Sequence, residues 1–242
     1  SAQGGALAFS YIDLSIKLAI DKQIDGVVTC PINKEALHAA GFKYPGHTEI
    51  HAEKCGVENF SMMFSLEDVS IVHVTTHCSL REALDLVSVE RVTRNIDLLH
   101  NALLSLGFEK PRIAVGGINP HAGENGLFGD EEIHHITPAI EAAQNRGLDV
   151  TGPFPPDTVF MSAFKGQYDG VVAMLHDHGF VAVKSRDFEK GVNITIGLPM
   201  IRTSVGHGTA FDIVGKGIAS EGSLLSAIDS ATKMAHFKQY QN

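Results

Sequence analysis

The chain has 242 residues, 44% of them hydrophobic and 19% charged, which suits one large α/β domain or two smaller lobes and excludes a disordered chain. Its formal net charge of -9 argues against a general nucleic-acid-binding surface, although a local basic pocket for a phosphorylated metabolite is compatible with it. No apolar run is long enough to cross a bilayer and no signal-peptide pattern opens the chain, so we expect a cytoplasmic protein without membrane or nucleic-acid partners.

The first fifty residues predict a candidate anion site in a loop before a helix. Residues 1–20 have apolar side chains at helical spacing and predict a largely buried helix, and residues 26–29 predict a strand. The loop 44–49, with the sequence YPGHTE, precedes another helix, and free backbone amides at a helix N-terminus attract anions. His47 and Thr48 would donate hydrogen bonds to a phosphate there. Alternatively, Thr48 is only the N-cap of that helix.

Three further predicted strands each end close to a histidine. The strands cover residues 70–75, 112–118 and 170–175, and the histidines that follow them are His77, His121 and His176. Ligands of open α/β sheets bind at the carboxyl ends of strands, and neutral imidazole is a common metal ligand. Each histidine alone has a more ordinary explanation as a surface or hydrogen-bonded residue. Their joint placement favours one divalent metal held by all three.

Polar residues downstream of the third strand favour an anionic ligand. Lys184, Asn193 and Arg202 supply two cations and an amide, each near a short apolar segment or a glycine. No GxGxxG motif follows the first strand, so an ordinary Rossmann dinucleotide site is unsupported.

The other notable residues have structural interpretations. The three cysteines do not suggest a disulfide framework, and Cys30 and Cys78 are interpreted as packing residues. The proline-rich stretch 151–157 predicts a stiff connector. At its end, Asp157 would either orient a ligand histidine or cap the following helix. Residues 221–240 predict a closing amphipathic helix.

The chain carries, in order, the motifs VTCPINKEAL, PGHTE, TTH, NPHAGE, GDEE, PPDTVF, MLHDHG and GVNITIGLPMIRTSVGHGTA. Over practically the whole chain, these motifs resemble the 4-hydroxythreonine-4-phosphate dehydrogenase family of pyridoxal phosphate biosynthesis and its paralogues. The resemblance implies a two-lobed α/β/α sandwich like that of isocitrate and isopropylmalate dehydrogenases, with the active-site cleft between the lobes. Residues 1–34 and 185–242 would form the first lobe. Residues 35–184 would form the second, with the metal site and the interface of a homodimer.

The resemblance also implies roles for particular residues. It implies one divalent metal per subunit (Zn, Mg or Co) on His77, His121 and His176, the last supplied across the dimer interface. Substrate contacts would come from His47, Thr48, Lys184, Asn193 and Arg202. Asp177 and Lys184 would be catalytic, with Lys184 also able to shuttle a proton. The family uses NAD without the Rossmann fingerprint, and NADP is a possible substitute.

The implied activity is NAD- and metal-dependent oxidation, with decarboxylation, of 4-phosphohydroxy-L-threonine to 3-amino-2-oxopropyl phosphate. The alternatives are a paralogue that oxidises 4-phosphorylated threonate, erythronate or a cis-dihydrodiol carboxylate, and a non-catalytic truncated remnant. Metal-assisted hydrolysis or aldol cleavage would use the same histidines but has no independent motif.

Three departures from the family pattern bear on these expectations. The family has a further glycine-rich N-terminal segment, so we expect that the N-terminal part of the family fold is absent and that the chain is a fragment or truncated product. His178 replaces the glutamine of an HDQG motif, and Gly206 replaces the aspartate of SVDHGTA. Losing a carboxylate near the cleft would alter cofactor or substrate contacts.

Overall fold

The computed structural model describes residues 1–186 and 190–240, with the side chain of Tyr240 left out. The chain forms two compact units, unit 1 (Ser1–Met62 and Glu189–Asn242) and unit 2 (Met63–Phe188). These units differ from the predicted lobes chiefly at one boundary, because residues 35–62 lie with the first unit rather than the second. Helices and strands alternate along most of the chain, which gives the predicted α/β fold class.

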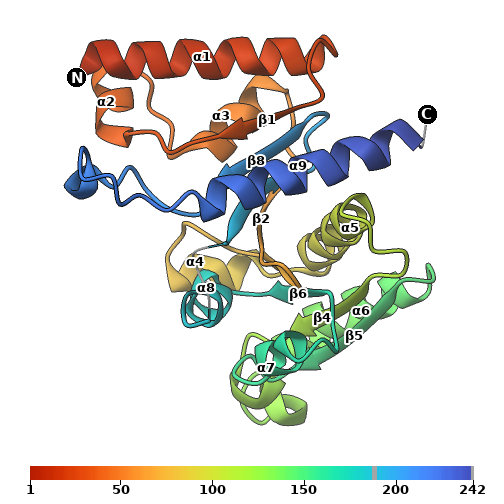
Figure 1. Ribbon diagram of the computed structural model, residues 1–242. Coiled ribbons are helices and arrows are strands. Elements are labelled where there is room, and N and C mark those ends of the chain that lie inside the picture. Colours follow the sequence, from red (N-terminus) through yellow and green to blue (C-terminus); the bar gives the residue numbers. More distant parts are fainter. Residues whose placement is uncertain (187–189, 241–242) are drawn as a thin grey trace. The chain divides into compact units, whose positions relative to one another are not determined.

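Unit 1 is built on three strands and four α-helices among its described residues. They are α1 (Ala2–Ile20), β1 (Gly26–Thr29), α2 (Lys34–Ala39), α3 (His47–Lys54), β7 (Val192–Ile196), β8 (Ile201–Val205), the 3₁₀ turn η3 (Phe211–Ile213) and α9 (Gly222–Tyr240). Strand β8 lies between β1, to which it is parallel, and β7, to which it is antiparallel. Helices α1 and α2 lie side by side (Figure 1). Glycine at position 5 permits their close approach, because a Cβ there would overlap the carbonyl oxygen of Ala36.

The first helix is less buried than predicted. Its buried residues are Gly5, Ile12 and Ile16, whereas Leu7 and Tyr11 are exposed. Ile12 and Ile16 pack in a small core with residues of β1, α2 and α3. Only one stripe of α1 is therefore buried in unit 1.

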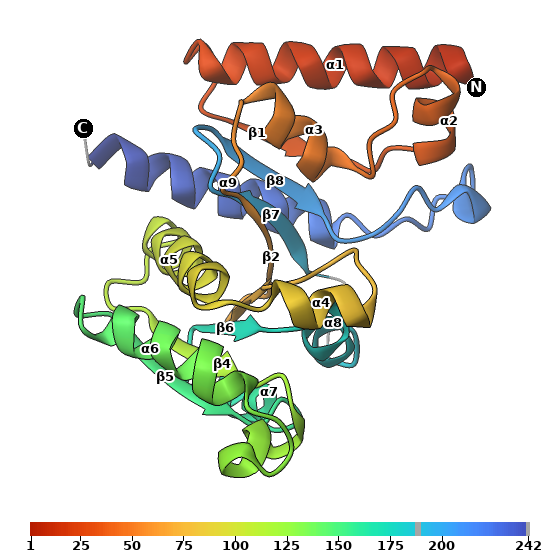
Figure 2. The ribbon, with the colours of Figure 1, turned by 180° about the vertical axis from the view of Figure 1, so that it is seen from behind.

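Unit 2 contains a largely parallel sheet covered by helices. Its elements are β3 (Ser70–His73), α4 (Leu80–Leu86), α5 (Val89–Ser105), β4 (Arg112–Gly116), η1 (Pro120–Gly126), η2 (Glu132–Ile136), α6 (Thr137–Gln144), β5 (Asp149–Phe154), α7 (Val159–Phe164), β6 (Gly170–Ala173) and α8 (His176–Lys184). Strand β2 (Ser61–Ser65) crosses the unit boundary and pairs antiparallel with β3. The strand order is β2-β3-β6-β4-β5, and the pairs from β3 to β5 are parallel. Figure 2 shows α5 and α6 side by side, as their contacts require.

The helices of unit 2 begin and pack as the local sequence dictates. Ser79 forms a capping box with Glu82, which confirms its predicted role as the cap of α4. Helix α5 packs against β6 because Gly170 leaves room for Leu99 and Leu103, whose side chains would lie 2.9 Å from an added Cβ. Every residue of β6 is buried, and α8 begins at His176, shortly after the strand ends.

Two expectations for the proline-rich stretch were wrong. Strand β5 extends to Phe154 and includes Pro153, so this part is not merely a connector. In the strand order, β5 lies at the edge, where the missing N–H of proline does not break the sheet. The residue that caps α7 is Thr158 and not Asp157. Within the described residues, no helix has the length and apolarity that crossing a membrane requires.

Candidate functional site

One face of the unit 1 sheet is polar. Because side chains alternate along a strand, the pairs Thr29↔Ser204 and Asn193↔Ser204 place these three residues on the same face. Arg202 lies two residues before Ser204 on β8, and Thr195 lies two residues after Asn193 on β7, so both are on that face too. Asn193 and Arg202, two of the four predicted substrate-binding residues of unit 1, therefore share one face of the sheet with hydroxyl groups.

Arg202 is a buried cation whose guanidinium, among the described residues, is hydrogen-bonded to hydroxyl groups. Arg202 is only 2% exposed. Its Nη1 donates to Thr195 Oγ1 at 3.0 Å and its Nη2 donates to Thr29 Oγ1 at 2.7 Å, while its buried Nε has no hydrogen-bond partner among the described residues. Burial lowers the pKa of Arg202 to about 10, and the charge of Glu49 opposes that shift. The guanidinium therefore stays charged at neutral pH, and among the described residues it is stabilised by two hydroxyl oxygens and by the charge of Glu49.

Helix α3 brings two histidines to this face. It lies beside β1 in both views of the ribbon (Figures 1 and 2). His47 Nε2 donates to the carbonyl oxygen of Cys30 at 3.1 Å, and the rings of His47 and His51 are 5.9 Å apart between centroids. Burial lowers the pKa of His47 to about 3 and that of His51 to about 4, and the charge of Arg202 acts in the same direction. Both imidazoles are therefore neutral at neutral pH.

Thr48 has a different role from the capping alternative. The N-cap of α3 is Gly46, and Thr48 is instead the second residue of the helix. Its Oγ1 lies 3.4 Å from Thr195 Oγ1, which in turn accepts from Arg202. The alternative that Thr48 only caps the helix was wrong, and Thr48 joins the hydroxyl network around the guanidinium.

Asn193 completes this group, which we call the Arg202 cluster (Thr29, His47, Thr48, His51, Asn193, Thr195 and Arg202). Its Nδ2 donates to Met62 Sδ at 3.1 Å, and its buried Oδ1 has no partner. The cluster holds four of the five predicted substrate-binding residues. The fifth, Lys184, belongs to unit 2, where its Nζ lies 5.7 Å from the centroid of the Phe180 ring.

The predicted metal ligands of unit 2 are only partly grouped. The rings of His77 and His176 are 5.9 Å apart between centroids, and His176 Nδ1 is hydrogen-bonded to Asp177 Oδ1 at 2.7 Å. That bond lowers the pKa of the exposed Asp177 and fixes the orientation of the imidazole, as carboxylate partners of ligand histidines do. The ring contact recorded for His121 is with Phe128, at 6.1 Å. Across residues 1–186 and 190–240, no three His, Cys, Asp or Glu side chains form a group that could hold a metal.

The backbone explains why His121 projects from an unusual loop. Residues His121, Ala122, Glu124 and Asn125 all have φ between 44° and 55°, so this turn is left-handed. The buried carboxylate of Glu132 holds the start of the loop. Its Oε1 accepts from the backbone N–H of Ile118 at 2.7 Å and of Asn119 at 2.8 Å, and its Oε2 accepts from Asn119 Nδ2 at 2.9 Å.

Two functional candidates were missed by the sequence reasoning. His51 lies one helical turn after His47, and this i, i+4 spacing was the signal that could have identified it. His73 lies on β3 and is 2% exposed, with both ring nitrogens unpartnered. Its ring stacks on Phe180, with centroids 4.8 Å apart, and lies 6.0 Å from the ring of His176. Burial lowers the pKa of His73 to about 3, so it is neutral at neutral pH.

His178, which replaces the family glutamine, is part of the same neighbourhood. Its Nδ1 is buried without a hydrogen-bond partner, and burial lowers its pKa. A Cβ on the next residue, Gly179, would overlap Nε2 of His73. Glycine is therefore required where α8 passes over β3. The other departure, Gly206, donates its backbone N–H to Ser223 Oγ at 2.9 Å.

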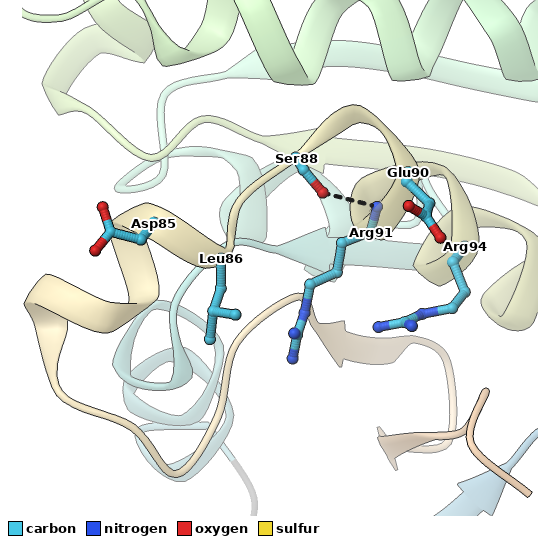
Figure 3. Close-up of a pocket in the computed structure, with 6 residues that line it drawn as sticks. All are labelled: Asp85, Leu86, Ser88, Glu90, Arg91 and Arg94. Carbon is cyan, nitrogen blue, oxygen red and sulfur yellow. Dashed lines mark hydrogen bonds between the residues drawn. The ribbon is translucent and has the colours of Figure 1, made fainter.

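A pocket of about 260 Å³ lies at the start of α5, apart from the predicted site residues. Figure 3 shows its lining residues, which are Asp85, Leu86, Ser88, Glu90, Arg91 and Arg94. Ser88 Oγ accepts from the backbone N–H of Arg91, and Arg91 Nε donates to the carbonyl oxygen of Val74 at 2.8 Å. Burial and the neighbouring charge of Arg94 lower the pKa of Arg91. These bonds tie α5 to the end of β3.

Two solved structures of dehydrogenases have a fold similar to that of this chain. A β-decarboxylating dehydrogenase from Thermococcus kodakarensis is 14% identical and has a TM-score of 0.54 over 88% of this chain and 74% of that chain, which shows a shared fold. A crystal structure of 4-hydroxythreonine-4-phosphate dehydrogenase from Klebsiella pneumoniae is 47% identical, with a TM-score of 0.85 over 97% of this chain and 72% of that chain. The chain therefore shares its α/β fold with these two dehydrogenases.

Sequence comparison then gives the family. The family described as "Pyridoxal phosphate biosynthetic protein PdxA" matches residues 1–231, and the chain belongs to this family. The 4-hydroxythreonine-4-phosphate dehydrogenase of Beijerinckia indica is 53% identical over 97% of this chain and 69% of its own length. The D-threonate 4-phosphate dehydrogenase of Cupriavidus necator is 52% identical over 97% of this chain and 71% of its own length. Relatives named for two different substrates thus match this chain about equally well.

Proposed function

We propose that this oxidoreductase oxidises a hydroxyl group of a four-carbon, 4-phosphorylated hydroxy acid, and that the resulting β-keto acid loses carbon dioxide. The observation that carries the proposal is the buried guanidinium of Arg202, whose hydrogen-bond partners within residues 1–186 and 190–240 are hydroxyl groups. A buried cation is costly unless an anion pairs with it, and such a substrate brings both a carboxylate and a phosphate. The names of the relatives offer two substrates of this kind, 4-phosphohydroxy-L-threonine and D-threonate 4-phosphate.

In this proposal the Arg202 cluster binds and orients the substrate. Arg202 neutralises an anionic group, and the hydroxyl of Thr48 and the amide of Asn193 supply neutral hydrogen bonds beside it. His47 stays neutral and therefore does not add a second buried positive charge. The network holds these side chains in place before the substrate arrives, which reduces the entropy lost on binding.

The residues of unit 2 supply the proton chemistry. Lys184 accepts or returns a proton during decarboxylation, and Asp177 holds the His176 ring through its bond to Nδ1. The donor set fits a divalent metal in part, because His77 and His176 are neighbours while His121 contacts Phe128. We infer that His77, His121 and His176 hold one Zn, Mg or Co ion in a homodimer, with one of the three coming from a second copy. When bound, the metal would acidify the substrate hydroxyl, and NAD or NADP would accept the hydride.

The test is NADH absorbance with metal-reloaded protein and a panel of 4-phosphohydroxythreonine, 4-phosphothreonate and 4-phosphoerythronate, with and without chelator. Chelator-sensitive turnover of one member is expected. Product formation without nicotinamide reduction would support cleavage or hydrolysis instead, and binding without turnover would support a non-catalytic protein.

The metal assignment has its own variant. His121→Ala should abolish metal-dependent turnover while leaving the fold intact, because the imidazole is replaced at the surface of a loop that Glu132 anchors. His134→Ala is the matched control, since His134 is an exposed histidine of the following helix. Unchanged turnover in reloaded His121→Ala protein would refute the ligand set. A monomer that still binds metal tightly would refute the shared site.

A further inference from the structure

His51 has one ring nitrogen committed to the protein and one that is not. The residue is 0% exposed. Its Nδ1 lies 2.7 Å from the carbonyl oxygen of His47, and its Nε2 is buried with no hydrogen-bond partner in the part of the chain that the structure describes. His51 is not among the site residues that the family resemblance predicts.

The first bond decides the chemical character of the second nitrogen. A carbonyl oxygen only accepts hydrogen bonds, so Nδ1 carries the proton and donates it to His47. In a neutral imidazole the other nitrogen then has a lone pair and no proton. Nε2 of His51 is therefore a buried acceptor that lacks a donor, and such a group destabilises the protein until a donor reaches it.

The neighbours of His51 indicate what kind of donor that is. His47 has the same character, because its Nε2 donates to Cys30 and leaves Nδ1 as a buried acceptor without a partner. Both rings feel the charge of Arg202. A ligand that fits here brings an anionic group for the guanidinium and, next to it, an uncharged donor. A hydroxyl meets this requirement better than an ammonium group, which the nearby guanidinium would repel.

We propose that His51 is a specificity-determining residue, whose Nε2 accepts a hydrogen bond from the hydroxyl next to the carboxylate that Arg202 binds. The inference rests on the proposed function. Oxidation to a β-keto acid there uses the hydroxyl on carbon 3, so the hydroxyl on carbon 2 is free to be recognised. It assigns to His51 the discrimination between a 2-hydroxy acid and its 2-amino or 2-deoxy counterpart.

Two amide substitutions separate this role from a structural one. In His51→Gln the amide reaches the position of Nε2, so an acceptor is retained there while the bond to His47 is lost. In His51→Asn the amide lies near the position of Nδ1, so the bond to His47 is retained while the acceptor is lost. His38→Gln is the control, because His38 is an exposed histidine of the same unit whose Nε2 bonds the carbonyl oxygen of Tyr44.

The readout is calorimetric binding of D-threonate 4-phosphate, its 2-deoxy analogue and 4-phosphohydroxythreonine to metal-reloaded protein without nicotinamide. The unsubstituted protein and His38→Gln should bind the 2-hydroxy acid about 10-fold more tightly than the 2-deoxy analogue, the value of one good neutral hydrogen bond. The preference should persist in His51→Gln and disappear in His51→Asn. A preference that persists in His51→Asn, or tighter binding of the 2-amino acid by the unsubstituted protein, would overturn the inference.

A measurement on the unsubstituted protein covers the case in which both variants fail to fold. With ¹⁵N-labelled histidine, the Nε2 resonance of His51 should move when D-threonate 4-phosphate is added and not when the 2-deoxy analogue is added. Equal responses to both ligands, or no binding of either, would refute the role of His51. Because no turnover is needed, absence of NADH formation refutes the proposed function without affecting this result.

Discussion

The Arg202 cluster of unit 1 and the His176 neighbourhood of unit 2 (His73, His176, His178 and Phe180) both bury polar atoms without a partner among the described residues, but they differ in charge. Unit 1 keeps a permanent cation under neutral hydroxyls and imidazoles. Unit 2 places neutral His73 against Phe180 and His176, whose Nδ1 is hydrogen-bonded to an exposed carboxylate. The first arrangement is suited to hold an anion, whereas the second offers imidazole lone pairs to a metal or a proton donor. In the proposed function, a buried cation would bind the substrate and neutral imidazoles would take part in the chemistry.

The largest expected effect comes from removing the cation in unit 1. Arg202→Met should weaken binding of a phosphorylated hydroxy acid by at least about 100-fold, because a buried charge contributes several kcal/mol to pairing with an anion. The free energy of unfolding without ligand should stay within about 1 kcal/mol or increase, since an unpaired buried charge is replaced by an apolar chain of similar length. Calorimetric binding and urea denaturation measure the two effects.

A matched arginine in unit 2 provides the control for this comparison. Arg112 donates from Nη2 to Asp169 Oδ1 at 2.7 Å, and its side chain is 45% exposed. Arg112→Met should lower the free energy of unfolding by about 1 kcal/mol and leave ligand binding unchanged. If Arg202→Met destabilised the unliganded protein more than Arg112→Met did, Arg202 would be a structural residue rather than an anion-binding one.

An intermediate effect is expected from the loop that carries His121. Glu132→Gln replaces an acceptor of three hydrogen bonds by an amide, and it should lower the free energy of unfolding by about 2 kcal/mol. Metal affinity should fall as well, because the loop is no longer anchored. Glu131→Gln is the comparison, since Glu131 also accepts from Asn119 Nδ2 but is less buried than Glu132. Equal losses in the two variants would contradict a special role of the buried carboxylate.

Much of the site could be predicted because its residues lie at element ends or in recognisable motifs. The strand 26–29 has the predicted bounds, and β6 ends shortly before His176, as its apolar run indicates. The resemblance predicted His47, Thr48, Asn193 and Arg202 as substrate contacts, and in unit 1 Thr48 and Arg202 both contact Thr195.

The remainder depends on geometry that sequence patterns do not encode. The acceptor on His51 exists only because Nδ1 is bound to the His47 carbonyl oxygen, which no spacing rule reveals. The loop of His121 follows a left-handed path through non-glycine residues, which are rarely found in that conformation. Strand β5 accommodates Pro153 because it lies at the edge of the strand order, and edge position is a property of topology rather than of composition.

The smallest expected effect is a pH dependence that belongs to the neutral imidazoles. His51 has an ordinary pKa of 6.5 and a folded-state pKa of about 4, so the unfolded chain binds its proton first as the pH falls. Stability from this group is fully present well above pH 6.5 and declines as the pH falls, by about 1.5 kcal/mol between pH 6.5 and 5, until the folded state also protonates near pH 4. His51→Gln should therefore flatten the decline measured by urea denaturation across this range, whereas His38→Gln should leave it unchanged. His47 has the same sign of shift and stays in place, so part of the acid sensitivity should persist in His51→Gln. An unchanged slope in His51→Gln would mean that His51 takes up its proton at the same pH in the folded and in the unfolded protein, so that burial does not lower its pKa.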